Sequence, residues 1–344
     1  MVKINPAPSS SADRLNRGGL GAGQVKKIIV IVGPTASGKS DLGIRLAKKF
    51  NGEIISADSR QVYRGLDIGT GKVPRDGNSK QTQNSKFKIQ NNAYFSSGIR
   101  HYLIDTVSPK KQFTADDFRR LGQKAIDDIV SRNKIPIIVG GTGFYIDVLL
   151  GRISVAEVPP NKKLRSRLDK FTAEYLFKML RKLDPKRSRS IDPKNKRRLI
   201  RALEIFFTTK KSSLNTKYKI PDTKYSILWI GLKPEDLEKR IKKRLDERLK
   251  QGMVREVKNL LKSGISKKRL HDFGLEYRWV TRYLNKKIDY KEMKEGLLRD
   301  IIKYSKRQMT WFTQPHPWEK DDPKKIHWLT SPTQAEKLVR AFLK

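Results

Sequence analysis

One glycine-rich turn constrains the fold of this chain more than any other stretch. Residues 28–32 are all Ile or Val, residues 41–50 repeat apolar side chains at helical spacing, and the eight residues between them fit G-x-x-x-x-G-K-[ST]. A strand, this loop and then a helix form a P-loop, in which backbone N–H groups and the helix N-terminus surround phosphate. Lys39 is expected to meet the terminal phosphates, and the Ser40 hydroxyl is expected to ligate Mg²⁺. The predicted polyphosphate-binding residues are Gly33, Pro34, Thr35, Ala36, Ser37, Gly38, Lys39 and Ser40.

Strand and helix patterns alternate from residue 27 to residue 151, which predicts the α/β fold class with a P-loop NTPase-like parallel sheet core. The expected strands are residues 27–32, 53–57, 101–105 and 135–139, and the expected helices are residues 41–50 and 114–133. Thr114 is predicted to cap the second helix, with Asp117 in the capping-box position. The polar residues 73–99 predict a mobile surface insertion or a hairpin, and residues 1–26, which lack apolar periodicity, predict a disordered tail.

The composition changes after Gly151. Residues 152–222 predict a mainly helical, basic insert domain, because residues 162–201 hold 16 Lys or Arg and only four acidic residues. Residues 226–232 predict a strand that rejoins the sheet. Residues 223–344 are therefore interpreted as the return to the core followed by C-terminal helices.

Composition limits the classes of function. With 344 residues the chain is long enough for two domains. It carries 76 Lys and Arg against 35 Asp and Glu, a net charge of +41, which indicates either a polyanionic partner such as nucleic acid or a solvated surface from a basic proteome. The absence of Cys excludes disulfides, thiolate zinc sites and a Cys nucleophile. No apolar run approaches the roughly 20 residues that span a bilayer, so a soluble protein is expected.

Polar residues at the ends of two expected strands are candidates for chemistry. Asp58 follows the strand 53–57, and the carboxyl ends of parallel strands meet at one edge, so Asp58 should approach Lys39. The Asp58 carboxylate would take a proton from a nucleophile or join a metal shell. Thr142, between glycines, would donate a hydrogen bond to a leaving oxygen or cap a helix, and these two roles are compatible.

A second set of candidates lies on a long helix, residues 235–251, which Pro234 is predicted to start and Gly252 to end. Arg240 and Arg244 lie four apart on this helix, so they share one face. They would clamp the far phosphate of a ligand or form part of a solvated face, and spacing alone leaves both readings open.

Five blocks of the sequence resemble the bacterial tRNA dimethylallyltransferase family. They are residues 33–40, 55–72, 140–146, 198–204 and 306–312, and they occur in the family's order between residues 27 and 330. The resemblance implies that dimethylallyl diphosphate, not ATP, is the P-loop ligand. It implies transfer of the dimethylallyl group to N6 of adenosine 37 in tRNA with release of diphosphate, and Mg²⁺ as the cofactor. A basic insert would then grip the phosphates of the anticodon stem.

The same resemblance implies roles for particular residues. The expected catalytic residues are Asp58, Thr142, Lys39 and Arg244, with Ser40 as the metal ligand. The expected tRNA contacts are Asp58, Ser59, Arg60, Gln61, Thr142, Arg165, Arg197, Arg198, Leu199, Ile200 and Arg201. The expected partner is the anticodon stem-loop of tRNA, and the protein is expected to be a monomer without membrane association. Because eukaryotic relatives commonly add a zinc finger and this chain has no Cys, a bacterial, cytoplasmic setting is expected.

Two departures from the family pattern matter. About 27 polar residues separate the Gly-Thr-x-Lys block from the His-x-Leu-Ile-Asp strand, where the family has a short connection. Residues 273–278 read Phe-Gly-Leu-Glu-Tyr-Arg where Gly-Tyr-Arg/Lys-Glu is expected, so no tRNA contact is assigned there. The rival interpretations are a small-molecule kinase, an enzyme that prenylates free AMP, and a nucleic-acid-binding ATPase whose turnover RNA stimulates.

Overall fold

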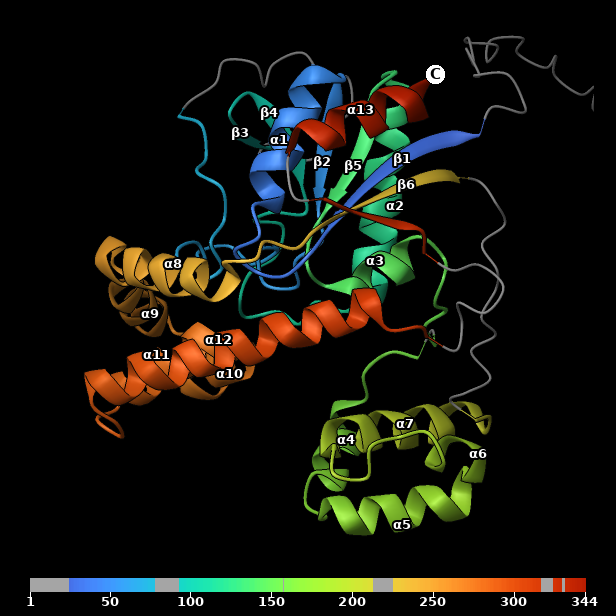
Figure 1. The fold of residues 1–344 in the computed structure, drawn as a ribbon. Helices are drawn as coiled ribbons and strands as arrows, with labels where there is room; N and C mark the ends of the chain where they lie inside the picture. Colours follow the sequence, from blue (N-terminus) through green and yellow to red (C-terminus); the bar gives the residue numbers. More distant parts are fainter. Residues whose placement is uncertain (1–24, 78–92, 157, 213–224, 317–323, 330–331) are drawn as a thin grey trace, which may run out of the picture.

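The computed structural model describes residues 25–77, 93–156, 158–212, 225–316, 324–329 and 332–344, and within these residues its centre is a seven-stranded sheet (Figure 1). The strand order is β3-β4-β2-β5-β1-β6-β7, and every neighbouring pair is parallel except β3 with β4. The strands are β1 Lys26–Val32, β2 Gly52–Ser56, β3 Tyr94–Ser96, β4 Ile99–Tyr102, β5 Ile135–Val139, β6 Tyr225–Leu232 and β7 Ile326–Leu329. The predicted α/β class with a P-loop-like parallel core is confirmed.

Helices cover both faces of the sheet, and this explains the unbroken apolar run of β1 (Figure 1). Ile29 and Ile31 pack in a cluster with the helices α1 (Lys39–Lys49) and α13 (Pro332–Leu343). The alternate residues of the strand, such as Val30, pack on the other face with α2 and α3. These helices span Ala115–Ser131 and Gly143–Leu149. The predicted Thr114 cap of α2 is present, with Asp117 completing a capping box.

Most predicted strands match the structure to within one residue at each end, but one has clearly wrong bounds. The expected strand 101–105 is β4, which begins at Ile99 and ends at Tyr102. It stops there because Leu103 and Asp105 have φ values of +63° and +53°, which no extended strand accommodates. β3 and β4 form a tight hairpin at the end of the polar stretch 73–99, whose residues 78–92 lie outside the described part, as do residues 1–24 of the expected tail.

The long helix after β6 also begins later than predicted. It is α8, Leu237–Gln251, and Asp236 rather than Pro234 precedes it, whereas its predicted stop at Gly252 is correct, with φ +102°. Four helices follow and pack under the carboxyl edge of the sheet (Figure 1). They are α9 Met253–Lys262, α10 Lys267–Phe273, α11 Leu275–Leu284 and α12 Tyr290–Thr313.

The basic segment forms a separate helical group below α12 (Figure 1). Its helices are α4 Lys162–Leu168, α5 Ala173–Leu183, α6 Pro185–Ser188 and α7 Lys196–Thr209. They enclose an apolar cluster of their own, which includes Leu176, Leu180 and Leu203. Residues 213–224 lie outside the described part, so the predicted far boundary of the insert stays a prediction. Among the described residues, no helix combines the length and apolar character needed to cross a membrane.

Candidate functional site

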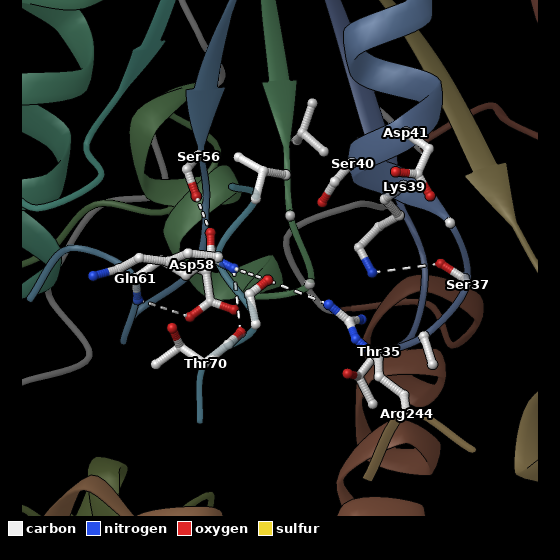
Figure 2. A pocket seen from close by; sticks show the side chains of 18 of the residues that line it. Thr35, Ser37, Lys39, Ser40, Asp41, Ser56, Asp58, Gln61, Thr70 and Arg244 are labelled. Atoms are coloured by element: carbon white, nitrogen blue, oxygen red, sulfur yellow. Dashed lines mark hydrogen bonds between the residues drawn. The ribbon is translucent and has the colours of Figure 1, made fainter. Parts of the chain in front are cut away.

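A cavity of about 580 Å³ opens at the carboxyl edge of the sheet, where β1, β2 and β5 end. Figure 2 shows its two sides: Lys39 and Ser40 lie on one, Asp58 and Gln61 on the other, with Arg244 between them. The expected proximity of Asp58 to Lys39 is also visible in electrostatics, because the Asp58 charge raises the pKa of Lys39. Further stretches of the chain also line the cavity, among them Thr70 to Pro74, Gly140 and Gly141, five residues of α8 between Arg240 and Arg248, Glu276 of α11, and Tyr304 and Gln308 of α12.

The P-loop side has the backbone that a phosphate cradle requires. Gly33 adopts φ +144° and a Cβ there would lie 2.4 Å from the Leu232 carbonyl oxygen, so glycine is needed. Gly38 adopts φ +89° and directly precedes α1. The Lys39 Nζ donates hydrogen bonds to the Pro34 carbonyl at 2.5 Å and to the Ser37 hydroxyl at 3.4 Å, so the lysine folds back over its own loop.

The Lys39 ammonium is electrostatically strained in this position. Burial, and secondly the nearby Arg244 guanidinium, lower the pKa of Lys39 to about 7, although Asp58 opposes the shift. Burial and the Arg248 charge likewise lower the pKa of Arg244 to about 10. Several cations therefore face one cavity with too few carboxylates to balance them, which is the arrangement expected of an anion site.

The opposite side is a turn built around Asp58. One carboxylate oxygen of Asp58 accepts hydrogen bonds from the backbone N–H groups of Arg60 at 2.8 Å and Gln61 at 3.3 Å. The second oxygen is engaged in no hydrogen bond found among the described residues. Asp58 is partly exposed and lines the cavity. The carboxylate is thus fixed in direction while one oxygen stays available to a ligand.

Three predicted site residues support this turn from within the protein. The Thr142 hydroxyl accepts a hydrogen bond from the Ser59 backbone N–H at 3.3 Å, and neither residue is among those that line the cavity. Thr142 holds the N-cap position of α3, yet its side chain makes no capping bond. The Gln61 side chain accepts from the Ser56 hydroxyl at 3.0 Å and donates to the Thr70 carbonyl at 3.3 Å.

Gln308 lines the cavity although no role was predicted for it, and it lies in one of the blocks that resemble the family. It accepts a hydrogen bond from the Thr35 backbone N–H at 2.8 Å and donates to the Gly141 carbonyl at 3.1 Å. A Cβ on Gly141 would lie 2.0 Å from the Gln308 amide nitrogen, so glycine there makes room for this contact. Gln308 therefore ties the P-loop to the loop after β5.

Arg240 and Arg244 of α8 both line the cavity, whereas their spacing predicted only that they share one face of the helix. Arg244 donates to the Gly71 carbonyl at 3.2 Å, and Arg240 pairs with Asp236 at 2.6 Å near the surface. Arg248 lies one turn further along α8, is buried and lines the cavity, but no role was predicted for it. It donates to the Gly69 carbonyl at 3.3 Å and to Glu276 at 3.2 Å.

The remaining predicted tRNA contacts lie on the separate helical group and not at the cavity. Arg165 and Arg201 are both paired with Glu204, which is 0% exposed, at 2.7 and 2.6 Å. Leu199 and Ile200 are buried in the group's apolar cluster, so their side chains are unavailable to a partner as the structure stands. Arg197 pairs with Asp272 of α10, and Arg198 is exposed.

Comparison with known proteins gives a consistent result. A profile of the IPP transferase family matches residues 61–315. The chain is 39% identical over 293 residues to the tRNA dimethylallyltransferase of Acetivibrio thermocellus, covering 83% of this chain and 88% of that protein. The crystal structure of the full-length tRNA isopentenylpyrophosphate transferase from Bacillus halodurans is similar, with a TM-score of 0.62 at 30% identity, covering 92% and 97% of the two chains. A eukaryotic dimethylallyltransferase acting on tRNA has a TM-score of 0.71 at 29% identity, covering 92% of this chain and 77% of its own.

Proposed function

Because this chain belongs to the IPP transferase family, we propose that its cavity transfers the dimethylallyl group of dimethylallyl diphosphate to N6 of adenosine 37 in tRNA, releasing diphosphate. The observation that carries the proposal is the division of one cavity between a P-loop with surplus cations and a turn that presents Asp58. We also propose that the protein acts as a monomer in the cytoplasm.

The cationic side suits a departing diphosphate. When the allylic C–O bond breaks, negative charge gathers on the leaving oxygens, and donors already aimed at that place stabilise the transition state. Lys39, Arg244 and the loop N–H groups supply such donors from the residues lining the cavity. An anion bound there also compensates for the burial and, secondly, the Arg244 repulsion that lower the pKa of Lys39.

The Asp58 side suits the acceptor amine. The lone pair of an adenine amino group is delocalised into the ring, so it attacks carbon poorly unless a base removes its proton. In the proposed step a bond forms between N6 and the allylic carbon, the C–O bond to diphosphate breaks, and the amine proton passes to the Asp58 carboxylate. Adenosine must leave its stack to reach the cavity. Thr142 supports the turn through the Ser59 N–H, which favours a positioning role over direct contact.

The donor set fits Mg²⁺ held largely by the substrate. Ser40 contributes a hydroxyl to the cavity, and the described residues contain no cluster of three or more His, Asp or Glu able to hold a metal by themselves. Mg²⁺ commonly keeps several waters and binds through one or two protein oxygens plus phosphate oxygens. When bound, the ion would neutralise charge on the departing diphosphate.

Incubating the protein with total tRNA and labelled dimethylallyl diphosphate, then locating the label, tests this function. Label at N6 of adenosine 37 is expected. Label on free AMP but not on tRNA would favour prenylation of the nucleotide, and RNA-stimulated ATP hydrolysis without label transfer would favour an ATPase.

The affinity for dimethylallyl diphosphate is expected to fall as pH rises above about 7. A bound diphosphate favours the protonated form of Lys39, whose pKa in the unliganded protein is about 7, so binding takes up a proton. The affinity should weaken by up to about tenfold per pH unit above that pKa. Titration calorimetry at several pH values in buffers of different ionisation enthalpy measures both effects. Lys39→Met should abolish the proton uptake. If the affinity of the wild-type protein did not change between pH 7 and pH 9, Lys39 would not be the group that takes up the proton.

tRNA affinity is expected to fall steeply with salt, and two arginines of α7 should differ in their share. Arg198 is exposed, so Arg198→Gln should reduce the slope of log K against log salt by about 1. Arg201 pairs with the buried Glu204, so Arg201→Gln should chiefly lower the melting temperature. Filter binding across a salt series gives the slopes. An unchanged slope in Arg198→Gln would place Arg198 on a solvated face instead of the RNA interface.

A further inference from the structure

Glu276 contacts one residue from each side of the cavity: Arg60 on the Asp58 side and Arg248 on the phosphate side. It sits at the start of α11, lines the cavity, and is only 3% exposed. One carboxylate oxygen accepts a hydrogen bond from Arg60 at 2.8 Å, and the other accepts from Arg248 at 3.2 Å. This residue lies in the stretch where the sequence departs from the family pattern, and no role was expected for it.

The Arg60 contact reaches the Asp58 turn. The Arg60 backbone N–H makes the shorter of the two hydrogen bonds to the Asp58 carboxylate, so the position of Arg60 helps to set the direction in which Asp58 points. The Arg60 side chain is 15% exposed and is held against Glu276, with the Tyr304 ring 5.7 Å from its guanidinium carbon. The guanidinium expected to meet tRNA is therefore used inside the protein.

The Arg248 contact reaches the phosphate side. A Cβ on Gly71 would lie 1.9 Å from one Arg248 nitrogen and 2.6 Å from one Arg244 nitrogen, so both guanidinium groups pack against this glycine. Arg244 is bonded to the Gly71 carbonyl, and Arg248 to that of Gly69. Arg244 and Arg248 repel each other beside the proposed diphosphate site, and the Glu276 charge offsets part of that repulsion.

We propose that Glu276 is a positioning residue for transfer: one of its oxygens fixes the Asp58 turn through Arg60, and the other fixes Arg248 beside Arg244. The inference rests on the proposed function and extends it, because a single buried carboxylate then sets the distance between the group that receives the proton and the groups that receive the diphosphate. Misplacing a reacting group by about 1 Å is enough to slow a reaction by about 10²-fold.

Single-turnover transfer to tRNA by the full chain tests this with Glu276→Gln, which keeps the shape and removes the charge. The transfer rate is expected to fall by about 10²-fold while tRNA affinity in filter binding changes less than about threefold. Glu276→Asp keeps the charge but is one methylene too short to reach both arginines, so it should also slow transfer. If Glu276 acts through Arg60, adding Arg60→Gln to Glu276→Gln should cost far less than Arg60→Gln does alone.

Glu53→Gln is the matched control. Glu53 is also 3% exposed and bridges two cations, Arg132 and Lys134, but it does not line the cavity. The Glu53→Gln substitution should lower the melting temperature and leave the transfer rate of the folded protein unchanged. Three outcomes would overturn the inference about Glu276 without touching the proposed function. They are a Glu276→Gln transfer rate within threefold of the wild type, an equal loss of rate in Glu53→Gln, and additive effects of Glu276→Gln and Arg60→Gln on the rate. A wild-type chain that transfers no label to tRNA overturns the proposed function together with it.

Discussion

Lys39→Ala is expected to slow dimethylallyl transfer by about 10²- to 10³-fold, the usual effect of removing one donor to a developing oxyanion. Lys39 lies in the cavity against the Ser37 hydroxyl and the Pro34 carbonyl, within reach of a ligand on the same loop. The loss should appear in single-turnover rates, because the charge that Lys39 meets is greatest when the C–O bond breaks. tRNA affinity should stay nearly unchanged, since the proposed RNA grip lies on other elements.

Lys48→Ala is the matched control for this change. Lys48 is exposed in the last turn of the same helix α1, so its removal tests for a general effect of charge or helix stability. Lys48→Ala should transfer at the wild-type rate. If Lys39→Ala lost tRNA affinity and transfer rate by the same factor, the role of the loop would be structural and the diphosphate assignment would be wrong.

The parts of this fold that the sequence predicts are those fixed by local chemistry. The P-loop needs only its own glycines, the apolar run before it and the helix after it, and the Thr114 capping box lies within four residues. The errors fall at element ends. The strand expected to reach Asp105 stops at Tyr102 because Leu103 and Asp105 have left-handed backbone conformations. The side-chain pattern of this stretch does not predict such conformations.

The candidate site divides in the same way. Asp58 and Lys39 could be placed together because parallel strands share one carboxyl edge. Gln308 contacts Thr35, which is 273 positions away in the sequence, and Arg248 contacts Gly69, which is 179 positions away. Nothing in the local sequence specifies such pairs. The basic excess was equally ambiguous, because residue type does not reveal that Arg165 and Arg201 pair with a buried Glu204 while Arg198 is exposed.

Asp58→Asn is expected to reduce transfer by about 10²- to 10⁴-fold, the usual contribution of a positioned base. Asparagine keeps the size of the side chain and an oxygen able to accept from the Arg60 and Gln61 N–H groups, but it has no proton affinity in this range. Binding of dimethylallyl diphosphate and Mg²⁺ should be almost normal. Asp76→Asn is the matched control, since Asp76 also accepts two backbone N–H bonds in a turn, from Ser97 and Gly98, and does not line the cavity.

A Mg²⁺ titration of single-turnover transfer by Asp58→Asn decides between the two readings that the sequence left open. If Asp58 takes the amine proton, excess Mg²⁺ cannot replace it, because metal on the diphosphate acts at the other end of the bond change. If Asp58 instead belongs to the metal shell, the variant should need more Mg²⁺ and recover most of its rate when the ion is in excess. The geometry favours the base, because Asp58 lies across the cavity from Ser40 (Figure 2). Recovery of the wild-type rate at high Mg²⁺ would sink the base assignment and make Asp58 a metal-shell carboxylate.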